Sequence, residues 1–134
     1  MHNEDLKNLS RARIIHSQDC LREANLLNEA HEWKGTANRA YCAAFHAMRA
    51  VLILDGFDSK KHSGIIAKFR ENYLKTDLFN KEISDSISSL FRVRSASDYD
   101  DFYIVSKDEA ERQLKNASMI VETIKQYLSK NNIV

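Results

Sequence analysis

The sequence contains no proline and only three glycines in 134 residues. Sandwiches and barrels of β-strands need many turns, and turns use glycine and proline, so this scarcity argues against them and favours a few long helices. Hydrophobic residues make up 43% of the chain and charged residues 29%, which is enough apolar material for one core and too much for intrinsic disorder. We therefore predict an all-α fold in a single domain spanning residues 1–134.

Low net charge, short apolar runs and few cysteines further limit the class of protein. The formal net charge is only +1, so we do not expect indiscriminate binding to a nucleic-acid backbone. The longest apolar run, Ala50–Leu54, is far shorter than the roughly 20 residues of a membrane span, and the first residues lack the apolar stretch of a signal peptide. The two cysteines, Cys20 and Cys42, show no metal-type spacing and suit a reducing compartment. We expect a cytoplasmic protein that does not enter a membrane.

Apolar periodicity predicts an up-and-down bundle of four to five helices. The clearest helix opens at Ser106, which forms a capping box with Glu109 and is followed by apolar residues at alternating spacings of four and three. Ser63 is a candidate N-cap for the third helix, and Gly56 is the expected stop of the second. The other helices are expected near residues 4–31, 36–55 and 80–95.

The second predicted helix has an unusual second face. Opposite its core face lie two polar residues, Arg39 and His46, among the small or apolar residues Ala43, Ala50 and Ile53. One interpretation is an ordinary solvated surface. The other is a subunit interface or cleft wall in which Arg39 and His46 are the polar groups, because small residues allow a close approach and a homodimer would bury the stripe.

A second polar group lies where the fourth helix is expected to end. Arg94 continues the inward stripe of that helix, so it needs an anionic partner, and Asp98 and Asp100 follow it. An Arg–Asp clamp that closes the bundle, with Tyr99 and Phe102 packed beneath it, would explain the segment. The alternative is an anion site in which Arg94, together with Arg39, binds a phosphate.

His62 precedes Ser63 and Gly64 at the start of a predicted helix, where free N–H groups attract anions, although a simple capped junction has the same pattern. The histidines are scattered along the chain, and the sequence has no glycine-rich phosphate loop and no HExxH motif. We therefore expect no metal site and no cofactor. The scattered histidines are His2, His16, His31, His46 and His62.

Three stretches resemble the HEPN superfamily (higher eukaryote and prokaryote nucleotide-binding domains), and in particular its short stand-alone bacterial and archaeal proteins. Asn38–Ala47 is similar to the helix pattern RxYYAxFHAxxA. Lys61–Gly64 and Arg94–Asp100 resemble the stretches that precede the third helix and follow the fourth. The resemblance extends from about Leu21 to Leu128 and implies a helical bundle that is usually a homodimer.

The resemblance also implies a function. Many HEPN proteins pair with minimal nucleotidyltransferases as toxin–antitoxin or defence systems, and many are metal-independent ribonucleases with an R-x(4–6)-H motif. Here Arg94 fits the motif arginine, but Tyr99 or Asp100 stands where histidine would be. Tyrosine has a pKa near 10 and is a weak base at neutral pH, so His46 is the other candidate for proton transfer.

Three functions follow from these residues. The first is a nucleotide- or RNA-binding HEPN component that acts with a nucleotidyltransferase. Its site would consist of Arg39, His46, Arg94, Asp98 and Tyr99, and His62 is a further candidate. The second is a metal-independent ribonuclease in which Arg94 neutralises the phosphate and His46 or Tyr99 handles protons. The third is a non-catalytic interaction module whose arginines only clamp the bundle.

Overall fold

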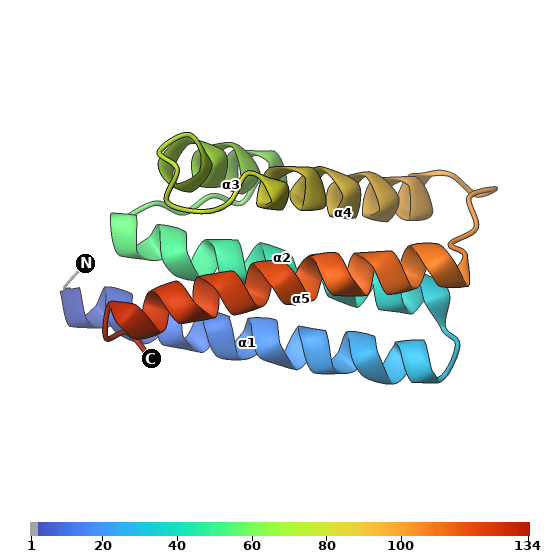
Figure 1. Cartoon of the computed structure of the whole chain (residues 1–134), viewed down its shortest axis with the longest axis horizontal. Helices are drawn as coiled ribbons and strands as arrows, with labels where there is room; N and C mark the ends of the chain where they lie inside the picture. The colour runs from blue at the N-terminus through green and yellow to red at the C-terminus, as the bar shows by residue number, and fades with distance from the viewer. Residues whose placement is uncertain (1–2) are drawn as a thin grey trace.

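The computed structural model describes residues 3–134 and confirms the all-α prediction for that part of the chain; His2 lies outside it. The structure has five α-helices; α1, α2, α4 and α5 run back and forth along the long axis, and the short α3 lies across it (Figure 1). A 3-10 turn, Ile53–Asp55, extends α2, and a π-helical segment, Arg70–Leu74, extends α3. The five helices are α1 (Asn3–Glu29), α2 (Trp33–Leu52), α3 (His62–Phe69), α4 (Glu82–Tyr99) and α5 (Lys107–Lys130).

The α2 helix is the centre of the bundle. It packs against each of the other four helices; α3 and α4 lie on one side of it, and α4 also contacts α5 (Figure 1). Twelve of its twenty residues are buried, which agrees with its mostly small and apolar sequence. Most side chains on α2 therefore lie close to another element, and this decides where its polar residues can act.

The second face of α2 is covered within the chain. Ala43 and Ala50 are fully buried, and the Ser17 and Ser10 hydroxyls of α1 donate hydrogen bonds of 2.6 Å to their carbonyl oxygens. Ile53, at the end of the same stripe, is also buried. The small residues of this stripe are not a solvated surface or a subunit interface, because they serve the close approach of α1; the cleft-wall alternative holds for His46, which borders a cavity. The stripe therefore gives no reason to expect a dimer.

The structure confirms two of the predicted helix ends and corrects two others. Gly56 ends the second helical segment in a left-handed conformation (φ 77°), as expected. The α3 helix begins at His62 without a side-chain cap, so Ser63 is not the N-cap. The α4 helix continues to Tyr99 instead of ending near residue 95. The Ser106 cap of α5 is confirmed, because its hydroxyl accepts a hydrogen bond from the Glu109 N–H at 3.1 Å.

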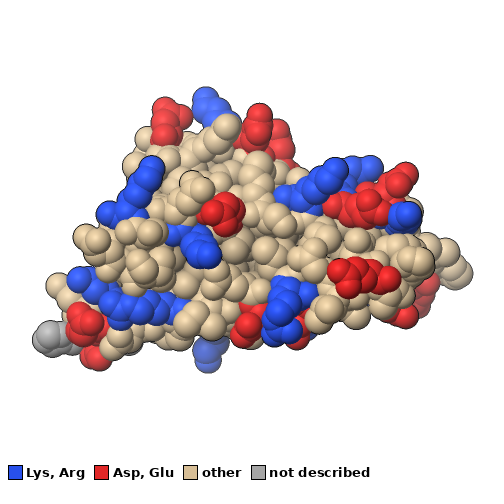
Figure 2. All heavy atoms as spheres, turned by 60° about the horizontal axis from the view of Figure 1, so that its bottom comes forward, with Lys and Arg blue, Asp and Glu red and all other residues tan. Residues whose placement is uncertain are grey.

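The surface carries charges of both signs. On the face shown in Figure 2, basic and acidic side chains alternate, and no broad basic band crosses it. This pattern agrees with the small net charge and restricts any anion binding to a local site. Along residues 3–134, none of the helices is both long and apolar enough to cross a membrane.

The α1–α2 contact leads to a stability prediction. We expect Ala43→Leu to lower the free energy of unfolding by about 1–3 kcal/mol, because the added side chain has no space between the helices. Ala12→Leu, at an exposed position of α1, is the matched control and should change it by less than about 0.5 kcal/mol. Urea unfolding followed by circular dichroism measures both. Equal effects of the two substitutions would contradict the close packing of α1 on α2.

Candidate functional site

The candidate site is a cavity of about 770 Å³ between α2 and the segment 58–62, called the α2 cleft below. One wall comes from α2 and carries aromatic, cationic and imidazole side chains. The other wall comes from the loop after Gly56 and the first residue of α3. The cleft is lined by Tyr41, Cys42, Phe45, His46, Arg49, Asp58, Ser59, Lys60 and His62.

Aromatic contacts hold His62 in the cleft. Its ring stacks on Phe45 with centroids 4.0 Å apart and planes inclined by 20°, and its Nδ1 lies 2.8 Å from the Tyr41 hydroxyl oxygen, a hydrogen-bond distance. Burial, followed by the charge of Arg94, lowers the pKa of His62. Burial raises the pKa of Tyr41 to about 12, so its hydroxyl stays protonated. His62 is thus a positioned imidazole and not merely part of a helix start.

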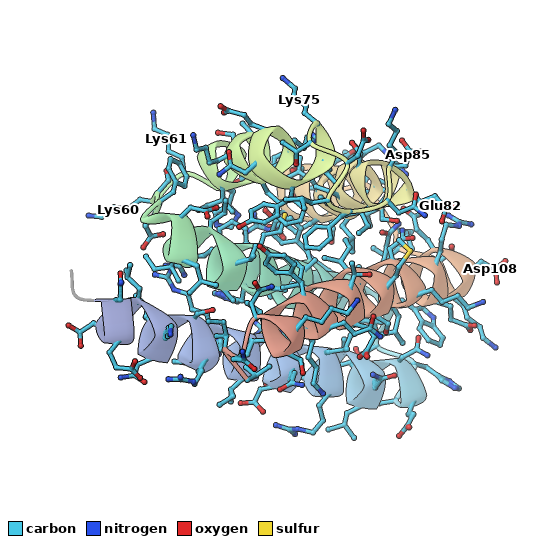
Figure 3. All side chains as sticks on the ribbon, turned by 60° about the vertical axis from the view of Figure 1, so that its left-hand side comes forward. Lys60, Lys61, Lys75, Glu82, Asp85 and Asp108 are labelled. Carbon is cyan, nitrogen blue, oxygen red and sulfur yellow. The ribbon has the colours of Figure 1, made fainter. Side chains whose placement is uncertain are left out.

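Cations surround the outer part of the cleft. Arg49 lies 6.0 Å from the centre of the Phe45 ring and 3.5 Å from the Asp58 carboxylate, which also forms a 2.7 Å ion pair with Arg13. Hydrogen bonds and charge from these arginines outweigh desolvation and lower the pKa of Asp58. Lys60 extends from the loop (Figure 3). Arg49 and Lys60 line this end of the cleft, and Arg13 pairs with the Asp58 carboxylate, so this end of the cleft suits an anion.

His46 is half-buried and lies on the α2 wall. Its ring packs edge-on against Phe45 and against His16 of α1, with centroids 5.6 and 4.2 Å apart. Burial, and after it the neighbouring His16 and Arg49, lower the pKa of His46 to about 4. The imidazole is therefore neutral at pH 7.

Arg94 adjoins the cleft through Tyr41. Its guanidinium carbon lies 5.1 Å from the centre of the Tyr41 ring, and its Nε lies 2.9 Å from the Asp98 carboxylate one helical turn away. The predicted Arg94–Asp98 pair is thus present. Asp100 instead accepts a hydrogen bond from the Phe102 N–H at 3.0 Å.

The rest of the predicted clamp is wrong. Tyr99 and Phe102 are 84% and 93% exposed, so neither packs beneath Arg94. Tyr99 is the last residue of α4, and Phe102 lies in the turn that follows it. An exposed Tyr99 also lacks the positioning that proton transfer requires.

The structure brings together only some of the predicted site residues. His46 and His62 share the α2 cleft, and Arg94 with Asp98 lies beside it. Arg39 does not line the cleft and lies 3.9 Å from Glu23 of α1.

The sequence reasoning missed the contribution of Tyr41, Phe45 and Arg49 to the cleft. Their spacing of four places them on one stripe of α2. That stripe borders the core face of α2. The signal for the cleft in the sequence was Arg49, a cation that follows the two aromatic residues at the same spacing.

Comparisons with known proteins agree with this architecture. The sequence model of the HEPN domain matches residues 10–127. A UPF0332 protein of Archaeoglobus fulgidus is 34% identical, with 89% of this chain and 94% of that protein aligned. A UPF0332 protein of Thermotoga maritima is 27% identical over 84% and 85% of the two chains. A protein named as a candidate toxin from Methanocaldococcus jannaschii is 28% identical over 94% and 93%.

The Arg94 contacts can be separated by mutation. We expect Arg94→Gln to lower the free energy of unfolding by about 1–2 kcal/mol, because it removes both the ion pair and the contact with the Tyr41 ring. Asp98→Asn should cost about 0.5 kcal/mol, since it removes only the ion pair. Thermal and urea unfolding measure the difference. An Asp98→Asn effect as large as that of Arg94→Gln would show that the Tyr41 contact contributes nothing.

Proposed function

This chain belongs to the HEPN domain family, and from that premise we propose that it binds RNA or a nucleotide in the α2 cleft as the toxin-like member of a toxin–antitoxin or defence pair. The observation that carries the proposal is the composition of the cleft. Arg49 and Lys60 supply positive charge, and two imidazoles lie against the face and edge of Phe45. The name of the similar M. jannaschii protein supports the toxin-like role.

The chemistry of the cleft suits a nucleic-acid ligand. Guanidinium groups bind phosphate through paired N–H donors, and Arg49 is already placed at the cleft by its contacts with Phe45 and Asp58. Unpaired bases of single-stranded RNA stack on aromatic and histidine side chains, and the His46 and His62 rings line this cavity, whereas Tyr41 and Phe45 are themselves buried. The small net charge is compatible with this function, because the charges are needed only at the cleft.

The partner of such a protein follows from the family. We propose a minimal nucleotidyltransferase as the partner and a homodimer as the assembly, as the resemblance to stand-alone HEPN proteins implies. The segment between α4 and α5 offers a surface for one of these contacts, because it exposes three large apolar side chains. These are Tyr99, Phe102 and Ile104, between 84% and 93% exposed.

RNA binding is tested by fluorescence anisotropy with a labelled single-stranded RNA. We expect Arg49→Gln to weaken binding about tenfold at moderate salt and to lower the salt slope by about 0.7, the value for one phosphate contact on a single strand. Arg22→Gln removes the same charge from an exposed position on α1 and is the matched control. Equal losses for the two variants would show non-specific attraction and contradict binding in the cleft.

A second candidate function is RNA cleavage, favoured by the presence of two imidazoles in one cavity. In this reaction a neutral imidazole takes the proton of the RNA 2′-hydroxyl, the oxygen attacks phosphorus, and the bond to the 5′-oxygen breaks. The leaving oxygen takes a proton from the Tyr41 hydroxyl, which lines the cleft and stays protonated at pH 7. His46, which is neutral at pH 7, is the candidate base.

Cleavage is tested with purified protein, RNA and EDTA. We expect His46→Gln to slow cleavage about 100-fold or more while RNA binding is retained, because only the base is removed. His31→Gln, an exposed histidine outside the cleft, should cleave as the unsubstituted protein does. Intact RNA with the unsubstituted protein across varied sequences would reject this second function and leave the binding proposal standing.

A further inference from the structure

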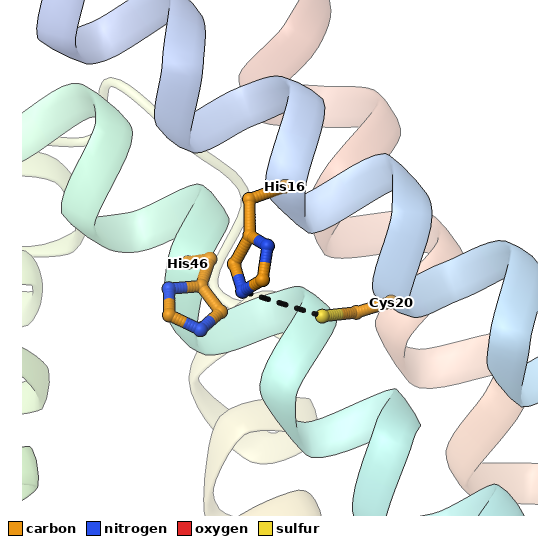
Figure 4. A group of neighbouring side chains, drawn as sticks. All are labelled: His16, Cys20 and His46. Atoms are coloured by element: carbon orange, nitrogen blue, oxygen red, sulfur yellow. Dashed lines mark hydrogen bonds between the residues drawn. The ribbon is translucent and has the colours of Figure 1, made fainter.

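Three potential metal ligands meet where α1 crosses the middle of α2. His16 and Cys20 are four residues apart on α1 and point to the same side, and His46 faces them from α2 (Figure 4). The cluster lies on the α1 side of α2, and among its members only His46 also lines the α2 cleft. The sequence did not indicate this cluster, because His46 meets His16 and Cys20 only when α1 packs against α2 in the folded chain.

The distances are close to those of a coordinated ion. The three ligand atoms lie within 4.8 Å of one another, and the Cys20 Sγ is 3.9 Å from the His16 Nε2. Tetrahedral zinc with ordinary bond lengths needs about 3.6 Å between a sulfur and a nitrogen ligand. Small side-chain rotations therefore suffice to bring all three atoms onto one ion, without movement of either helix.

We propose that His16, Cys20 and His46 form a binding site for one divalent transition-metal ion of the zinc class. Three protein ligands leave the fourth tetrahedral position to water or to an external ligand, as in open zinc sites. Coordination replaces the thiol proton of Cys20, which is released to solvent, and leaves a thiolate–metal bond. The site joins the two helices whose contact forms the middle of the bundle.

The ligand set selects the metal. Imidazole and thiolate are preferred by zinc, copper, cobalt and nickel, whereas magnesium and calcium need oxygen ligands that this cluster lacks. Positive charges also lie near the cluster. Arg49 lies close enough to influence His46, and Arg39 lies near Cys20 with Glu23 as its partner. These positive charges repel every divalent cation, zinc included, so binding depends on the metal's bonds to the thiolate and the imidazoles.

The burial of the three ligands suits entry and retention of an ion. Cys20 is fully buried between the helices, His46 is half-buried and His16 is exposed. An ion can therefore enter from solvent next to the exposed His16 and bind the buried Cys20 sulfur. The metal measurement is made without RNA, because His46 is shared with the α2 cleft whereas His16 and Cys20 are not.

The probe is cobalt(II), added to full-length protein that has been freed of metal with a chelator. We expect one equivalent per chain to give a thiolate-to-cobalt charge-transfer band, which zinc(II) then removes by displacement. Cys20→Ser should abolish the band, and His16→Ala should weaken cobalt binding about tenfold or more, since even loss of a second-shell partner costs about 10- to 100-fold. Bound zinc should also raise the unfolding temperature.

Matched variants keep the test decisive. Cys42→Ser and His31→Ala replace the other cysteine and another exposed histidine, and both should keep the band and the affinity. His16→Ala alters an exposed side chain and should fold, so it decides the question even if Cys20→Ser does not fold. No thiolate band at one equivalent, an unchanged affinity of His16→Ala, or an equal loss with Cys42→Ser would each overturn the proposal.

Discussion

The close approach of α1 to α2 is the constraint on which the rest of the molecule depends. Ala43 and Ala50 leave room for it, and the Ser10 and Ser17 hydroxyls hold it by donating to the α2 carbonyls. A larger side chain at either alanine would separate the helices. Because this contact occupies one side of α2, the polar residues on its other sides are left to face α3, α4 and the loop after Gly56. The cleft exists because α2 is covered unequally.

The α1–α2 contact places His46 between the α2 cleft on one side and the cluster with His16 and Cys20 on the other. His46 borders the cleft that holds Arg49 and His62, and it also faces His16 across the α1–α2 contact. Its half-buried position makes it neutral, which suits both a proton acceptor and a metal ligand. A metal ion on His46 and proton transfer by His46 therefore exclude each other. If both proposals hold, a bound metal ion prevents proton transfer by His46 and leaves Arg49 and Lys60 uncoordinated.

Local sequence was sufficient for most of the fold, because helices follow from periodicity and caps that neighbouring residues determine. The Ser106 cap and the Gly56 stop are of this kind. The end of α4 could not be predicted from local sequence. The chain stays helical through Arg94 and Asp98, whose ion pair stabilises the last turn. His46 and His62 were each found as candidates, but their meeting in one cavity depends on how α3 folds back on α2. No pattern along the chain contains that information.

The two arginines nearest the cleft share a feature that bears on selectivity. Arg49 lies beside Asp58, and Arg94 lies beside Asp98, so each guanidinium is positioned by a carboxylate in the absence of ligand. These carboxylates reduce the attraction for scattered anions, because each cation is already partly neutralised. A phosphate must supply enough hydrogen bonds to compete with them. Under the proposed function, a nucleotide that also contacts the His62 ring competes with these carboxylates better than a free anion does.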